Sequence, residues 1–255
     1  MKKTAIILSV FVVILSGCKP KTSSANLQAT FLQTDTLNNQ QELTQKDTNQ
    51  DSLYLLQLED EFNSHPLVSA EEVARIAPVI KKWTKFYKLD FAKARLVNVS
   101  TECFNCVQDD KDNLYYYKIN KEEDTDKKIG VDYSPNRQLY VSFISTLEKN
   151  GKYYHIGWDD SQNVWLIDRK QKHATTILFH GVGGLTEGAF WKSNDTFIVV
   201  SCDYKEQPFI RYMVDVFDIA KQTQTSYQIM REGKEDFSNG YVYEVYFKEK
   251  GIIAD

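Results

Sequence analysis

The chain has 255 residues, of which 42% are hydrophobic and 13% aromatic, enough to form one sizeable core. Its formal net charge is −4 and no basic stripe runs along it, so nucleic acid is excluded as an expected partner. His155, His173 and His180 do not fall at the spacing of metal ligands, and we predict neither a metal site nor a cofactor. A single domain over residues 51–255 is the simplest organisation.

Residues 1–17 have the layout of an export signal. Lys2 and Lys3 give a positive start, and an apolar run follows from Ala5 to Leu15 with one interruption at Ser9. A helix that crosses a bilayer needs about 20 apolar residues, more than this run provides. A permanent transmembrane helix is therefore not expected here.

The apolar run ends in LSGC, residues 15–18, which resembles the lipobox of bacterial lipoproteins. In that family the signal is removed, and the cysteine receives acyl chains such as palmitate and becomes the new N-terminus. The resemblance therefore implies lipid attachment at Cys18, with several acyl chains giving an effectively permanent membrane anchor. Lys19 replaces the aspartate that retains enteric lipoproteins at the inner membrane, so we expect an outer-membrane position facing the periplasm.

Residues 18–50 are rich in Gln, Asn, Thr and Ser, and their hydrophobic residues are too sparse to support a core. This composition predicts a flexible tether. A chain of this length would hold the domain about 30 Å from the membrane.

The helical signal is strongest over residues 69–89. Ser69 with Glu72 three residues later forms a capping box, which predicts the start of the helix. Pro78 lies inside the segment and should kink the helix or end its first part. One apolar face at helical spacing is expected to pack on the sheets, and it comprises Val73, Ile76, Ile80, Trp83 or Thr84, and Tyr87.

Cys103 and Cys106 form a CxxC motif in a chain expected to enter an oxidising compartment. A thioredoxin-like site would be followed by a helix, whereas here a polar turn and a tyrosine-rich strand pattern follow. We therefore expect either a local disulfide between Cys103 and Cys106 or two half-buried thiols. Cys202 is left without a neighbouring cysteine in sequence.

Residues 94–247 contain sequence echoes about 50 residues apart. DYSPNRQLYVSF (132–143) aligns with FWKSNDTFIVVS (190–201) and with DFSNGYVYEVYF (236–247), and IDRKQKHATTI (167–177) aligns with FDIAKQTQTSYQI (217–229). The region resembles the diverged WD-type repeats of bacterial β-propeller proteins. That resemblance implies a mainly β fold of about three to four propeller-like antiparallel sheets with one N-terminal helix. Because a closed propeller typically needs at least four blades, a β-sandwich is the alternative.

Two segments contain residue types that are found at functional sites. The glycine-rich loop from His180 to Gly184 matches neither an esterase nor a nucleotide-binding motif, so we predict a tight connection between two sheets. Trp158, Asp159 and Asp160 place an aromatic ring beside two carboxylates and form a candidate ligand-binding group for a sugar. The Asp-Asp pair recurs at residues 109–110, which favours a structural turn instead.

No recognisable set of catalytic residues occurs in the sequence, so an enzyme is the less favoured reading. The leading hypothesis is a membrane-anchored, non-enzymatic module that binds an envelope protein or a glycan. The alternative is a carbohydrate-active or other hydrolase that uses carboxylates from loops. A sensor or inhibitor that occupies a groove of its partner is a third hypothesis.

Overall fold

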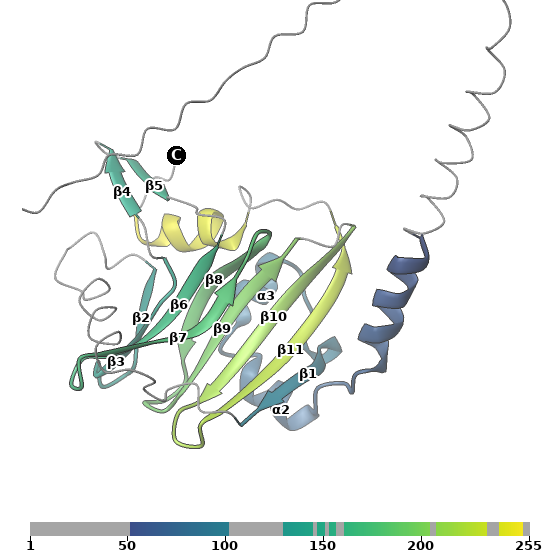
Figure 1. Ribbon diagram of the computed structural model, residues 1–255, viewed down its shortest axis with the longest axis horizontal. Helices are drawn as coiled ribbons and strands as arrows, with labels where there is room; N and C mark the ends of the chain where they lie inside the picture. The colour runs from purple at the N-terminus through teal and green to yellow at the C-terminus, as the bar shows by residue number, and fades with distance from the viewer. Residues whose placement is uncertain are drawn as a thin grey trace, which may run out of the picture. The chain divides into compact units, whose positions relative to one another are not determined.

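The structure is a computed structural model that describes residues 52–101, 130–144, 147–150, 153–156, 161–204, 208–233 and 240–251. The described residues are mainly β, with two antiparallel sheets of five and four strands, a two-stranded hairpin and a few short helices (Figure 1). The predicted fold class is confirmed at this level.

The four-stranded sheet has the order β2-β3-β6-β7, and a hairpin of β4 and β5 is inserted in the chain between β3 and β6. The five-stranded sheet has the order β1-β11-β10-β9-β8. The strands are β1 (Arg95–Ser100), β2 (Val131–Tyr133), β3 (Leu139–Ser142), β4 (Leu147–Asn150), β5 (Tyr153–Ile156), β6 (Gln162–Asp168), β7 (His173–His180), β8 (Gly184–Trp191), β9 (Thr196–Asp203), β10 (Phe209–Asp218) and β11 (Thr223–Glu232).

The two sheets contain corresponding four-strand meanders, β2-β3-β6-β7 and β8-β9-β10-β11. The turns after β6 and β10 have the same geometry: Lys172 and Gln222 occupy equivalent positions with φ of 55° and 54°. In each turn the aspartate that ends the preceding strand, Asp168 or Asp218, accepts hydrogen bonds from backbone N–H groups of the turn. The aligned pairs 132–143 with 190–201 and 167–177 with 217–229 are thus equivalent in structure.

The prediction for the third aligned segment is wrong. Residues 236–247 were expected to form another strand, but Val242–Phe247 forms the helical segment η4. Val242 and Phe247 are buried in the core between the sheets, and a short apolar run of this kind fits a buried helix as well as a strand.

The described ranges contain two sheets of this type, which do not close into a ring, where the sequence predicts three to four propeller-like units. The strand β1, which precedes the other strands, adds to β11 as a fifth strand instead of starting a further sheet. An apolar core that includes Phe143 and Leu166 from one sheet and Phe197 and Phe217 from the other lies between them.

The segment 69–89 is broken at Pro78 into α2 (Ala70–Ile76) and α3 (Lys81–Phe86), as its sequence predicts. Ser69 is the N-cap, and its Oγ accepts a hydrogen bond from the backbone N–H of Glu72 at 3.2 Å. The capping box is one-sided, because the Glu72 carboxylate pairs with Arg75.

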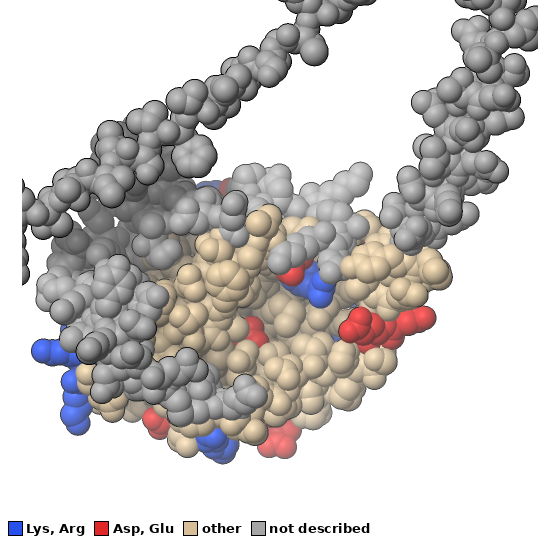
Figure 2. Space-filling model, viewed as in Figure 1, with Lys and Arg blue, Asp and Glu red and all other residues tan. Residues whose placement is uncertain are grey.

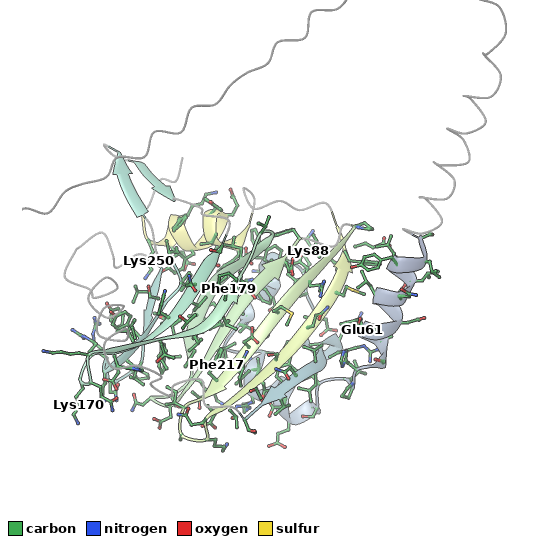
Figure 3. All side chains as sticks on the ribbon, viewed as in Figure 1. Glu61, Lys88, Lys170, Phe179, Phe217 and Lys250 are labelled. Carbon is green, nitrogen blue, oxygen red and sulfur yellow. The ribbon has the colours of Figure 1, made fainter. Side chains whose placement is uncertain are left out.

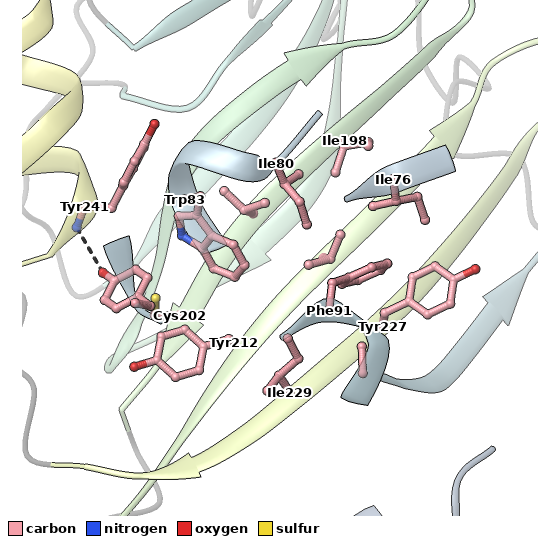
Figure 4. Packing of buried hydrophobic residues seen from close by; sticks show 14 of the residues in the cluster. Ile76, Ile80, Trp83, Phe91, Ile198, Cys202, Tyr212, Tyr227, Ile229 and Tyr241 are labelled. Atoms are coloured by element: carbon pink, nitrogen blue, oxygen red, sulfur yellow. Dashed lines mark hydrogen bonds between the residues drawn. The ribbon is translucent and has the colours of Figure 1, made fainter. Parts of the chain in front are cut away.

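Several short helices replace the single helix that the sequence predicted. Residues 52–64 are helical, Phe91–Lys93 forms a 3₁₀ turn named η1, and η4 follows the last strand. α2 and α3 lie behind the five-stranded sheet in Figure 1. The predicted apolar face is confirmed there: Ile76, Ile80 and Trp83 are fully buried in one cluster with residues of β9 and β10 (Figure 4). Within the described ranges no helix combines the length and apolarity needed to cross a bilayer.

Candidate functional site

The most buried carboxyl group of the described fold is that of Glu187, at a bulge in β8. The register between β8 and β9 shifts between Thr186 and Gly188, so Glu187 has no partner residue in the ladder. Its side chain is completely buried on the side of the sheet that α3 covers. An unsatisfied charge in this position would cost several kcal/mol, so its partners decide whether the site is stable.

Four donors surround the Glu187 carboxylate. The Trp83 indole N–H donates to Oε2 at 2.7 Å, and the Cys202 thiol donates to the same oxygen at 2.9 Å. The Tyr87 hydroxyl donates to Oε1 at 2.5 Å. The backbone N–H of Tyr241 lies 2.9 Å from this oxygen and 2.9 Å from the Tyr87 hydroxyl, and the dashed line in Figure 4 marks the second of these bonds. We call Glu187, Trp83, Tyr87, Cys202 and Tyr241 the carboxylate cluster.

Burial dominates the electrostatics of this cluster. Desolvation raises the pKa of Glu187, and the hydrogen bonds from Cys202, Tyr87 and Trp83 oppose that rise. Desolvation and the nearby Glu187 charge raise the pKa of the Cys202 thiol well above its ordinary value. The thiol therefore remains a protonated hydrogen-bond donor and is a poor nucleophile.

The carboxylate cluster acts as a structural clamp. Its members come from α3, β8, β9 and the segment that leads into η4, so one carboxylate joins four parts of the chain. Both oxygens of Glu187 already accept two hydrogen bonds, and the residue has no exposed surface. A general acid must reach a substrate, which this side chain cannot do.

A small pocket that opens to solvent lies between helical residues 52–64 and strands β10 and β11. It is on the face of these strands opposite to the one that α2 and α3 cover. Side chains alternate along a strand, so Ile210 and Tyr212 join the core under the helices while Phe209 and Arg211 point to the open side. The lining residues are Leu58, Glu61, Phe62, His65, Phe209, Arg211, Gln228 and Met230, and we call this the helix–sheet pocket.

Arg95 holds the end of this helical segment on the sheet. Its guanidinium donates to the backbone oxygen of His65 at 2.6 Å and to Asn63 Oδ1 at 3.2 Å. The same guanidinium lies 5.4 Å from the centre of the Phe62 ring. One wall of the helix–sheet pocket is thereby fixed to β1.

The helix–sheet pocket has mixed chemistry and small size. Arg211 and Glu61 provide opposite charges, Gln228 an amide, and Phe62 and Phe209 aromatic surface. Its volume of about 50 Å³ is well below the roughly 300–1,000 Å³ of sites that enclose small molecules. Glu61 is the one carboxylate in its lining, whereas glycoside hydrolysis normally uses two. The pocket therefore suits a single inserted side chain better than an enclosed sugar.

Most residues singled out from the sequence lie outside the described ranges. This applies to Cys18, to Cys103 and Cys106, and to the group Trp158, Asp159 and Asp160, so the expectations about them stay predictions. The glycine-rich loop is confirmed as a connection between sheets, since it links β7 to β8 and Gly183 adopts φ of 90°.

No motif in the sequence predicted the carboxylate cluster or the helix–sheet pocket. A signal for Glu187 existed, because it is the one acidic residue within the otherwise uncharged strand GLTEGAFW. A signal for Arg211 was its place in the alternating strand FIRYMVDVFD. The partners of both residues come from distant segments, which no local pattern connects.

The described residues contain no group of three or more His, Cys, Asp or Glu side chains placed to hold a metal ion. Comparisons with protein-family models, with curated proteins and with solved structures give no match to this chain.

Proposed function

We propose that the protein is a membrane-anchored lipoprotein of the bacterial envelope whose β domain binds another envelope protein. The LSGC sequence ending at Cys18 supports the anchor, and Lys19 after it supports a position at the outer membrane, facing the periplasm. The observation that carries the binding role is the helix–sheet pocket on the uncovered face of the five-stranded sheet.

The composition of this face favours a protein partner over a glycan. Aromatic residues, Met and Arg are enriched in protein interfaces, and Phe62, Phe209, Met230 and Arg211 all line the pocket. Seen from this side, the described surface is mainly uncharged at its centre, with charged side chains towards its edges (Figure 2).

The proposal is tested by site-specific photo-crosslinking in the native host. A photoreactive amino acid replaces Gln228 at the pocket in one strain and exposed Lys85 on α3, behind the sheet, in a control strain. We expect a discrete protein adduct from position 228, none from position 85, and at least a fivefold weaker adduct when Phe209→Ala is added.

Two results would overturn the proposal. One is an equal yield of adducts from positions 228 and 85. The other is the absence of any protein adduct at position 228, together with retention of a cell-wall polysaccharide by the purified protein that Phe209→Ala abolishes. The second result would assign the pocket to a glycan.

A further inference from the structure

Three turns meet at one end of the described domain. They are residues 134–138 between β2 and β3, residues 169–172 between β6 and β7, and residues 192–195 between β8 and β9. The backbone N–H of Arg169 donates to the Gln138 carbonyl at 3.0 Å, and the backbone N–H of Asn136 donates to Asn194 Oδ1 at 3.0 Å. Hydrogen bonds thus join the three turns into one surface.

This surface concentrates positive charge in a chain whose net charge is −4. Four acidic residues lie in or close to the three turns, namely Asp132, Asp168, Asp195 and Asp218. Asp168 Oδ1 accepts hydrogen bonds from the backbone N–H groups of Lys170 and Gln171 at 2.8 and 2.9 Å, Asp132 accepts one from the backbone N–H of Trp191, and Asp218 pairs with Lys221 at 2.9 Å. The basic residues are all exposed, and they are Arg137, Arg169, Lys170, Lys172 and Lys192. We call these five residues the basic platform.

The backbone under the basic platform is held by several further contacts. Ser134 Oγ bonds to Asn136 Oδ1 and to the backbone of Leu139, each within 3.0 Å. The Arg137 guanidinium stacks 4.4 Å from the centre of the Tyr133 ring, and Arg169 Nη1 donates to the Arg137 carbonyl at 3.2 Å. Because these turns are already ordered, binding through them costs little conformational entropy.

We propose that the basic platform docks on the anionic phospholipid headgroups of the membrane that carries the protein. This inference rests on the proposed anchor at Cys18. The five cations are spread over three neighbouring turns, an arrangement that fits a planar array of phosphate groups. Each basic side chain close to an anionic bilayer strengthens binding by about fivefold.

The predicted tether would strengthen this weak interaction. A chain with the flexibility that the composition of residues 18–50 predicts would span about 30 Å on average, and it would thus hold the lipid headgroups at a high effective concentration. Lys170 and Glu61 lie on opposite sides of the described domain in Figure 3. Docking through the basic platform would therefore leave the helix–sheet pocket, which Glu61 lines, facing away from the bilayer.

The experiment uses the chain from position 18 onward with Cys18→Ser, so that no acyl chain masks the interaction. The described fold begins at residue 52 and keeps all its residues in this protein. Flotation with vesicles of 60% phosphatidylcholine and 40% phosphatidylglycerol is compared with flotation with pure phosphatidylcholine vesicles. The test variant is Lys170→Glu/Lys172→Glu, and the matched control is Lys81→Glu/Lys85→Glu, which makes the same charge change on α3.

We expect binding to the anionic vesicles, none to the neutral vesicles, and loss of binding in 0.5 M salt. The Lys170→Glu/Lys172→Glu variant should bind at least tenfold more weakly, while the control variant stays within threefold of the unaltered chain. Absence of binding to anionic vesicles, or equal weakening in both variants, would overturn the inference. Crosslinking from position 228 reports on the helix–sheet pocket and is independent of these outcomes.

Discussion

The indole nitrogen of Trp83 lies 2.7 Å from the carboxylate of Glu187, although 104 positions separate the two residues in sequence. This bond joins α3 to the bulge in β8. Glu187 also accepts hydrogen bonds from Cys202 in β9 and from Tyr241, which precedes η4. The same carboxylate therefore links α3 to the five-stranded sheet and to η4. The stability of the described fold should therefore depend on these donors.

Trp83→Phe removes one donor and leaves a fully buried carboxylate with one hydrogen bond fewer. We expect the free energy of unfolding to fall by about 2 kcal/mol or more, as measured by urea denaturation. Trp191→Phe is the matched control, because its indole N–H donates to the partly buried backbone oxygen of Asp132 at 3.0 Å. That variant should lose about 1 kcal/mol. Equal losses in the two variants would contradict the importance of the Glu187 bond.

The Cys202 thiol should resist alkylation in the folded protein. Its side chain is buried and its pKa is raised by desolvation and by Glu187, so the reactive thiolate is scarce. We expect iodoacetamide to label Cys202 only at the rate at which the protein unfolds, and rapidly once urea is added. Mass spectrometry of the peptide that contains Cys202 gives both rates. Fast labelling without denaturant would show that the thiol is accessible.

Asp132 should make the stability depend on pH. Desolvation raises its pKa from 3.8 to about 6, against the opposing effects of the Trp191 backbone N–H and Lys250. The folded protein then holds this proton more tightly than the unfolded chain, so the free energy of unfolding falls as pH rises from about 4 to about 6 and then levels off. The fall should be up to about 3 kcal/mol.

Asp132→Asn should make this fall smaller, whereas exposed Asp195→Asn should leave it unchanged. Glu187 and Asp215, whose pKa values burial also raises, keep their own contribution in both variants. Urea denaturation between pH 4 and pH 7 measures the slope in each variant. A slope in Asp132→Asn equal to that of the unaltered protein would assign the pH dependence to the other buried carboxylates.

Comparing alanine substitutions at Gly130 and Gly251 separates the cost of backbone strain from the cost of steric overlap. Both have positive φ, at 76° and 69°. A Cβ at Gly130 would lie 2.3 Å from the Ile144 Cβ, whereas a Cβ at Gly251 would meet nothing within 4 Å. We expect Gly251→Ala to cost about 1 kcal/mol from strain alone and Gly130→Ala at least twice as much. Thermal denaturation of the two variants tests this order.

Local features of the fold were predictable from the sequence, and contacts between distant segments were not. Ser69 and Pro78 act through the neighbouring backbone, so the start and the break of the helical region could be predicted. The aspartate-containing turns after β6 and β10 repeat at a fixed spacing, which revealed the corresponding meanders. The strand predicted over the segment ending in Phe247 was wrong, because the apolar residues of this segment fit a strand or a helix equally well.

The candidate sites depend on contacts that composition and spacing do not encode. The donors to Glu187 come from positions 83, 87, 202 and 241, and the helix–sheet pocket combines residues 58–65 with two strands more than 140 positions later. The basic platform could not be predicted for the same reason. Arg137, Lys170 and Lys192 are scattered in sequence, and the folding of three hairpins brings them to one surface.

Attachment to lipid at Cys18 underlies the proposed envelope role and the proposed membrane docking, and the N-terminus of the protein made by its own host tests this attachment most directly. Mass spectrometry of that material should find a polypeptide that begins at Cys18 and carries acyl groups on this residue. A polypeptide that still begins at Met1, with a free thiol at Cys18, would contradict both the anchor and the envelope role built on it.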